Sequence, residues 1–126
     1  MPPLHVLLVE DTPAVAKSLQ LCLEQAGHRV TLAENGWQAA EMVRQNPVDV
    51  VVTDYDLPGL TGSQLCFLLR SNHERCDLPI IMITGKAMEL DVEWLHDEHS
   101  LVSVLAKPVK PKELIALIDS CCSRQS

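Results

Sequence analysis

The chain has 126 residues, of which 47% are hydrophobic and 21% are charged, and its formal net charge is -7. This length suits one compact domain with its own core and excludes a second folded domain. The acidic balance excludes the basic face that direct nucleic-acid binding requires, and no apolar run is long enough for membrane insertion.

These exclusions favour a cytoplasmic protein whose partners are metal cations and other proteins. The cysteines are odd in number and show no CxxC pair or disulfide-like spacing. We interpret them as reduced, mostly structural thiols: Cys22, Cys66, Cys76, Cys121 and Cys122.

Short aliphatic segments, each typical of a buried strand, alternate with segments of helical periodicity. The predicted strands cover residues 4–9, 28–33, 48–53, 78–84 and 101–106. The predicted helices cover residues 13–26, 37–46, 64–72 and 111–121, and a segment with a weaker helical pattern covers residues 86–97.

Proline and glycine mark the boundaries of these elements. Thr12 and Pro13 indicate the N-terminus of the first helix, and Gly27 indicates its end. Pro47 closes the second helix, and Pro111 begins the last one.

Strands that alternate with helices in this way predict a doubly wound parallel sheet with right-handed crossovers and helices on both faces. The fold class is therefore α/β. The segment 28–33 alternates like an edge strand, and the nearly continuous apolar runs are typical of central strands, which favours the flavodoxin-like order 2-1-3-4-5. In such sheets, ligands bind at the carboxyl ends of the strands, beside the switch point of the topology.

Polar residues stand where the carboxyl ends of the predicted strands meet. They are Glu10 and Asp11 after the first strand, Asp54 after the third, Thr84 at the fourth and Lys107 after the fifth. Clustered carboxylates repel one another unless a cation neutralises them, and hard oxygen ligands suit Mg²⁺ or Mn²⁺. The hydroxyl and the ammonium group would stabilise the oxygens of a transferred phosphoryl group. The pattern therefore predicts a site that carries phosphate on a carboxylate.

Four segments resemble the response-regulator receiver family of two-component signalling. They are Val9-Glu10-Asp11, residues 53–62 (Thr-Asp-Tyr-Asp-Leu-Pro-Gly-Leu-Thr-Gly), Ile83-Thr84-Gly85 and Lys107-Pro108. Each segment alone is a weak signal, but they occur in order, and each lies at the end of its own predicted strand. The resemblance spans residues 4–122, and it implies one stand-alone receiver domain over residues 1–126.

The resemblance implies that Asp54 is the phosphoacceptor, which receives a phosphoryl group from the phosphohistidine of a histidine kinase or a histidine phosphotransfer protein. It also implies that Mg²⁺, with Mn²⁺ as the alternative, is held by Glu10, Asp11, Asp54 and the backbone carbonyl of Asp56. The protein would then be a phosphorelay switch that acts through a downstream target protein, and not a turnover enzyme.

Further roles follow from the same resemblance. Thr84 and Lys107 match the phosphate-sensing hydroxyl and the ion-pairing lysine, and the Lys107-Pro108 peptide bond is expected to be cis. Asp56 and Lys86 match the two loop positions that tune how fast water removes the phosphoryl group. We hypothesise that their opposite charges pair across the site and screen it from the attacking water.

Two features depart from the usual pattern of the family. Receivers commonly signal through an aromatic residue three positions before the lysine, where this chain has Val104, so we expect a different readout. The segment 86–97 carries two apolar stripes on different helical faces, Ala87-Leu90-Trp94 and Met88-Val92-Leu95. One stripe can face the sheet, and the other predicts a partner or homodimer surface shared with the neighbouring strand and helix, unless the helix is buried more deeply.

Other functions compete with a receiver. Asp54-Tyr55-Asp56 also resembles the first motif of haloacid-dehalogenase-like phosphatases, which would use Asp54 and Asp56 as nucleophile and general acid. In that family the motif follows the first strand, whereas here it follows the third. A flavodoxin-like electron carrier shares the strand order, but its flavin phosphate would need hydrogen-bond donors where residues 10–13 are acidic. A receiver-like fold that serves as a phosphate-independent binding module is the remaining alternative.

Several residues have a purely structural interpretation. Asp11 and Asp54, each considered alone, are typical helix N-caps. Trp37 and Trp94 are interpreted as packing residues. Two pairs offer too few ligands for a zinc site: His96 with His99, and His73 with Cys76.

Overall fold

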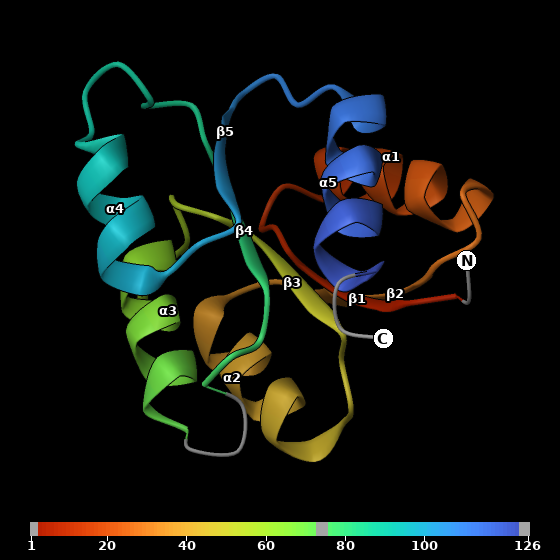
Figure 1. The fold of residues 1–126 in the computed structure, drawn as a ribbon, viewed down its shortest axis with the longest axis horizontal. Helices are drawn as coiled ribbons and strands as arrows, with labels where there is room; N and C mark the ends of the chain where they lie inside the picture. Colours follow the sequence, from red (N-terminus) through yellow and green to blue (C-terminus); the bar gives the residue numbers. More distant parts are fainter. Residues whose placement is uncertain (1–2, 73–75, 124–126) are drawn as a thin grey trace.

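The computed structural model describes residues 3–72 and 76–123, apart from the side chains of residues 122 and 123, and its strands and helices alternate along the chain (Figure 1). The strands are β1 His5–Val9, β2 Arg29–Ala33, β3 Val50–Asp54, β4 Ile80–Thr84 and β5 Ser103–Ala106. The helices are α1 Pro13–Gln25, α2 Gly36–Gln45, α3 Gly62–Ser71, α4 Val92–His99 and α5 Pro111–Ser123. This alternation confirms the predicted α/β class.

The strands form one parallel sheet in the order β2-β1-β3-β4-β5, which confirms the predicted order. The register pairs Val9 of β1 with Thr53 of β3, and it pairs Asp54 with Ile83 of β4. The carboxyl ends of these strands therefore reach the same edge of the sheet, which we call the site edge.

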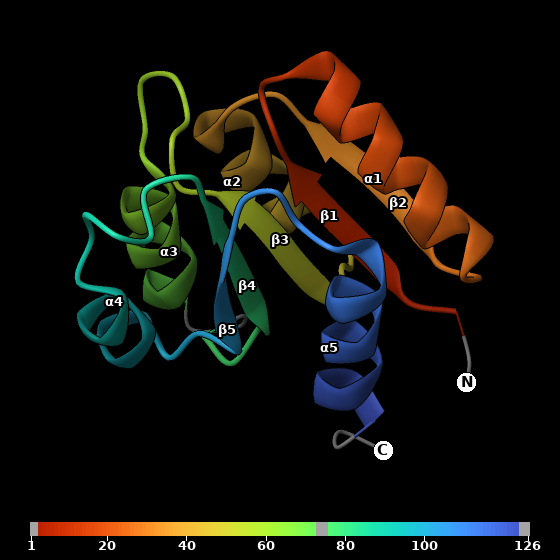
Figure 2. The ribbon, with the colours of Figure 1, turned by 90° about the horizontal axis from the view of Figure 1, so that it is seen from above.

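The helices cover the two faces of the sheet in two layers (Figure 2). Helices α1 and α5 pack on one face, over a cluster that includes Leu8, Leu23 and Ile118. Helices α2, α3 and α4 pack on the other, over a cluster that includes Leu7 and Leu65. Both clusters are built from aliphatic side chains, and each such side chain contributes about 1.5–3 kcal/mol when it is fully removed from water.

Strand β3 begins and ends later than predicted. The prediction placed it over residues 48–53, whereas the structure places it at Val50–Asp54. Asp54 is therefore the last residue of the strand, and its backbone pairs with β4. The sheet ladder thus holds the Asp54 side chain at a fixed place on the site edge.

The fourth helix is shorter than the segment 86–97, so the predicted pair of helical stripes is wrong. The Asp91 carboxylate accepts a hydrogen bond from the backbone N–H of Trp94 and so caps a helix that begins at Val92. The residues before it form turns, in which the backbone N–H groups of Glu89 and Leu90 donate to the carbonyl of Lys86. Met88 therefore lies in a loop and is fully exposed.

An arginine on α3 holds the C-terminal end of α4. The Arg70 guanidinium donates hydrogen bonds to backbone carbonyls of two segments. At the end of α4 the acceptors are His99 and Ser100, and in the segment before β4 they are Cys76 and Leu78. A further hydrogen bond joins Ser63 Oγ to the buried His99 Nε2 at 2.7 Å. Burial lowers the pKa of both His99 and Arg70. These contacts fix the C-terminal end of α4 against α3.

The prediction that the tryptophans are packing residues is wrong. Trp37 on α2 is 62% exposed, and Trp94 on α4 is 53% exposed. The Trp94 ring makes an edge contact with the His99 ring, at 6.0 Å between ring centroids. The aliphatic residues fill the core without either tryptophan.

Among the described helices, none combines the length and the apolar character that crossing a bilayer requires.

Gly62, the first residue of α3, lies directly beneath the end of β3. Its backbone N–H donates to the carbonyl of Tyr55 at 2.8 Å. A Cβ at this position would lie 2.5 Å from the backbone oxygen of Asp54 and 2.9 Å from Cα of Tyr55. Neither backbone atom can move without shifting Asp54, so only glycine allows this approach of helix to strand.

We therefore expect Gly62→Ala to lower the free energy of unfolding by about 1–3 kcal/mol, although alanine is the better helix former. Urea denaturation followed by circular dichroism would measure it. Gly85→Ala is the matched control, because a Cβ there would come no closer than 3.8 Å to the Lys107 side chain. Equal stability of Gly62→Ala and wild type would contradict the proposed close packing.

Candidate functional site

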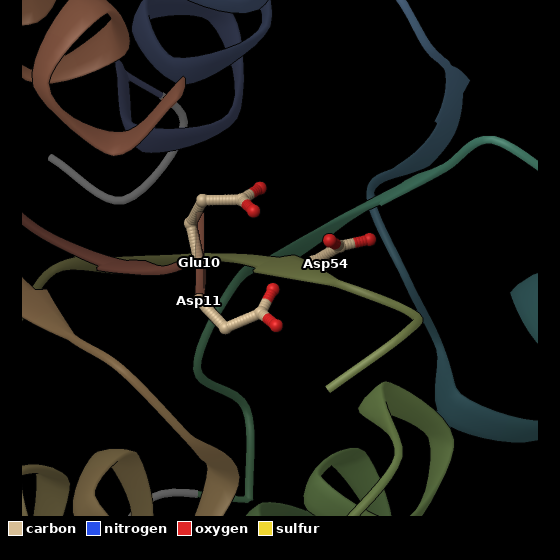
Figure 3. Close-up of side chains that lie close together, drawn as sticks. All are labelled: Glu10, Asp11 and Asp54. Carbon is tan, nitrogen blue, oxygen red and sulfur yellow. The ribbon is translucent and has the colours of Figure 1, made fainter. Parts of the chain in front are cut away.

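The acidic side chains predicted to converge do so at the site edge (Figure 3). Glu10 and Asp11 follow β1, and Asp54 ends β3. One carboxylate oxygen from each lies within 4.8 Å of the others. Glu10 and Asp54 are buried, whereas Asp11 is exposed. The cluster is therefore open to solvent on the side of Asp11.

Lys107 brings a positive charge into this cluster. It follows β5, and its backbone N–H donates to the carbonyl of Thr84 at 2.9 Å. Its Nζ lies 2.7 Å from Asp54 Oδ2 and 3.7 Å from Glu10 Oε2. The peptide bond between Lys107 and Pro108 is cis. The ammonium group thus bridges two carboxylates that come from different strands.

Burial and charge shift the titration of this cluster. Burial raises the pKa of Glu10, and the negative charge of Asp54 adds to the rise, against hydrogen bonding by the Thr12 backbone N–H. Burial alone would lower the pKa of Lys107, but its hydrogen bond to Asp54 and the surrounding carboxylates outweigh burial, so its pKa is raised. The lysine therefore stays charged at neutral pH and compensates part of the acidic charge.

The donor set fits a small, hard divalent cation. In the part of the chain that the structure describes, Glu10, Asp11 and Asp54 are the one group of acidic, histidine or cysteine side chains close enough to share a metal ion. Carboxylate oxygens are the preferred ligands of Mg²⁺ and Mn²⁺. The single lysine cannot balance three carboxylates, so the cluster retains negative charge for a cation.

The remaining predicted residues border this cluster. Thr84 is fully buried at the end of β4, and its Oγ1 accepts a hydrogen bond from the backbone N–H of Lys86 at 2.9 Å. Lys86 Nζ lies 3.2 Å from Asp56 Oδ1, and both side chains are about half exposed. The hydrogen bond to Asp56 raises the pKa of Lys86. The hypothesised pair of opposite charges is thus formed beside Asp54.

A groove that the sequence did not reveal opens beside the same cluster. It has a volume of about 540 Å³ and lies between α1 and the segment that leads into α5. Its walls are mostly apolar, and they include Val15, Pro108 and Val109, with Glu10 and Lys107 at the end nearest the site. The exposed Val15 on α1 was the one available signal, and a single exposed valine is ordinary on a protein surface.

The other candidate residues do not assemble a second site. His99 is buried against Ser63, whereas His96 pairs with Asp97 on the surface, so these histidines do not converge. His73 lies outside the described residues. The described cysteines are free thiols, and burial raises the pKa of Cys66 to about 12.

Comparison with known families gives an independent match. The model of the response regulator receiver domain matches residues 6–119. Protein PilH of Pseudomonas aeruginosa is 35% identical over 116 residues, which is 92% of this chain and 95% of that protein. The transcriptional regulatory protein BaeR of Escherichia coli is 34% identical over 95% of this chain, which spans about half the length of that relative (48%).

Solved structures show the same likeness. A putative response regulator from Chloroflexus aurantiacus is 32% identical, with a TM-score of 0.89 over 97% of this chain and 99% of that one. The receiver domain of a sensor histidine kinase from Pseudomonas aeruginosa is 30% identical, with a TM-score of 0.87 over 96% of this chain and 98% of that one. That domain was solved with a magnesium ion coordinated in its active-site cleft.

The contacts of Lys107 yield a test of the electrostatic balance. Without a divalent cation, Lys107→Met should lower the free energy of unfolding by about 1 kcal/mol, because Asp54 and Glu10 lose their shared positive partner and the site is partly screened by solvent. Adding Mg²⁺ should stabilise this variant more than wild type, as measured by thermal denaturation. Lys112→Met, at an exposed position, is the control. An equal effect of Mg²⁺ on wild type and both variants would refute the proposed compensation of the carboxylates by Lys107.

Proposed function

Because the chain belongs to the response regulator receiver domain family, we propose that it is a signalling switch that is phosphorylated on Asp54. One observation carries this proposal: a buried aspartate at the end of the central strand is held 2.7 Å from a lysine and within 4.8 Å of two further acids. Such a set can hold a cation and a phosphoryl group together.

The phosphoryl transfer that this geometry supports is a nucleophilic displacement. A carboxylate oxygen of Asp54 attacks the phosphorus of a phosphohistidine, and the new O–P bond forms as the N–P bond breaks. The electron pair of that bond returns to the imidazole nitrogen of the donor, which then takes up a proton. Lys107 is positioned to stabilise the phosphoryl oxygens, since its ammonium group already contacts the attacking carboxylate.

Glu10, Asp11 and Asp54 would hold Mg²⁺, together with the backbone carbonyl of Asp56, and Mn²⁺ is the alternative for the same oxygen ligands. When bound, the ion neutralises negative charge on the transferred group. The magnesium ion in the related receiver domain from Pseudomonas aeruginosa supports this assignment. Asp11 is the exposed member of the set, so it lies where a hydrated cation can enter.

Thr84 is suited to sense the phosphoryl group. Its hydroxyl ends β4 beside the site, and it anchors the start of the following loop through the backbone N–H of Lys86. A phosphoryl oxygen that accepts a hydrogen bond from this hydroxyl would reorient the Thr84 side chain. The bond from the Lys86 backbone N–H would then weaken, and the loop would change its conformation. Val104 on β5 has no ring to follow that change, so the signal would leave through the loop and α4.

We further propose that the histidine donor docks on the apolar groove beside α1. The donor is a histidine kinase or a histidine phosphotransfer protein, and the groove ends at Glu10 and Lys107, next to the acceptor. An apolar surface there would dock a donor protein and place its phosphohistidine over Asp54. The phosphorylated form then acts through a downstream target protein.

Intact-mass measurement after incubation with Mg²⁺ and acetyl phosphate tests the phosphoacceptor. Wild type should gain one phosphate in a metal-dependent manner, and Asp54→Asn should gain none, because the amide is not a nucleophile here. The exposed Asp97→Asn is the matched control and should behave as wild type. An adduct that persists in Asp54→Asn would exclude this acceptor, and no adduct in wild type would favour a phosphate-independent binding module. Steady turnover of a phosphomonoester would instead favour the haloacid-dehalogenase-like phosphatase.

The pair of Lys86 and Asp56 yields a prediction on phosphoryl lifetime. The two charged groups lie 3.2 Å apart beside the acceptor and so limit the approach of water to the phosphoryl group. We expect the double variant Asp56→Ala and Lys86→Ala to lose phosphate about 3-fold faster or more, which corresponds to about 0.7 kcal/mol in the barrier. Loss of the mass adduct over time measures this rate, and an unchanged rate would remove the pair from the mechanism.

A further inference from the structure

The aromatic residues of this chain are gathered on one surface. The sequence has two tryptophans, one phenylalanine and one tyrosine. Trp37, Phe67 and Trp94 are 62%, 67% and 53% exposed, and they lie on α2, α3 and α4, the helices of one layer. Tyr55 is the remaining aromatic residue and is half-buried beside the core. Both tryptophans occupy the first turns of their helices, at the end nearest the site edge.

Exposing these rings is unfavourable unless something covers them. An aromatic side chain removes about 150–250 Å² from water when it is buried, so the three rings and the partly exposed Leu68 present roughly 500 Å² of apolar surface. A stable interface buries about 800 Å² on each partner, of which about 57% is apolar. The exposed area therefore matches what one side of a stable dimer needs.

The same surface also contains a socket for an aromatic ring. A groove of about 270 Å³ lies between α2 and α3, and its apolar walls come from residues of both helices: Trp37, Ala40, Val43, Leu68 and Leu69. Three polar residues complete the lining: Glu41, Arg44 and Asn72. Phe67 lies on the other side of α3, toward α4, because Ser63 and Arg70 on the same helix face both bond to the end of α4. A projecting ring and an apolar socket are thus side by side on one face.

We propose that the outer face of the α2, α3 and α4 layer joins two copies of this chain about a two-fold axis that runs along α3. Rotation about this axis places Phe67 of each copy over the groove between α2 and α3 of the other. Each copy then contributes one ring and one socket, as a symmetric interface requires. This reciprocity favours a second copy of the chain over an unrelated protein.

Charge favours the same arrangement. The exposed edge of α4 carries Glu93, Asp97 and Glu98, and among the described residues no lysine or arginine forms an ion pair with any of them. On α2, Arg44 lies in the lining of the groove, and its exposed guanidinium contacts Glu41 of its own helix. An axis along α3 brings Arg44 of one copy toward the acidic edge of the other. An axis across the helices would instead set the two acidic edges against each other.

This surface differs from the homodimer surface predicted from the sequence, which comprised the segment 86–97 with the neighbouring strand and helix. It is independent of the phosphoryl chemistry, so it is tested on unphosphorylated protein. Sedimentation velocity of the full chain, from about 1 μM to about 1 mM, should show a monomer-dimer equilibrium. Phe67→Ser should raise the dissociation constant at least 10-fold, since the small hydroxyl side chain cannot fill the socket of the partner, and Arg44→Glu should raise it as well.

Leu21→Ser is the matched control, because Leu21 is also an exposed apolar residue, at 57%, but lies on α1 in the opposite layer. Its dissociation constant should equal that of wild type, and circular dichroism should show that all variants are folded. Monomers throughout the concentration range would overturn the proposal, and so would an equal effect of Leu21→Ser and Phe67→Ser. A face that binds a different protein while the chain itself stays monomeric would overturn it equally.

Discussion

The repulsion between Glu10, Asp11 and Asp54 is the constraint around which the site edge is organised. Parallel strands carry these carboxylates to one edge, and the sheet ladder leaves them little freedom to move apart. Their negative charges must therefore be compensated in place. Lys107 does so in part, and its approach depends on β5 lying beside β4 in the sheet. The charge balance at the site edge thus depends on both the strand order and the register of the sheet.

The compensation by Lys107 is incomplete, and this matters for a switch. A fully neutralised cluster would attract no divalent cation, whereas this one retains negative charge on a partly open surface. In the proposed function, a divalent cation and then a phosphoryl group would change the partners of Asp54, Lys107 and Thr84 together, since these groups already touch or border one another. A local change of charge can in this way alter the loop that leads to α4, while Arg70 keeps the far end of that helix fixed.

Much of this was predictable because it depends on short patterns. The valine-rich run before Asp54 and the alternation at residues 28–33 were sufficient for the strand order, and the polar residues at strand ends indicated the site. The start of α4 was not predicted, because apolar residues from 86 onward mimic a helix and the Asp91 cap outweighs them. Arg70 resembles an ordinary surface charge in sequence, and its bonds to carbonyls depend on loops distant in the chain. The exposure of Trp37 was missed because hydrophobicity alone cannot tell a core contact from an external one.

The separation between an aliphatic core and peripheral rings has an optical consequence. In most globular proteins, unfolding moves tryptophan from an apolar interior into water, and the emission spectrum shifts to the red. Here Trp37 and Trp94 are already more than half exposed in the folded chain. Unfolding of the core would therefore change their emission wavelength only slightly. Tryptophan emission would instead change when a binding partner covers the outer surface of α2 or α4.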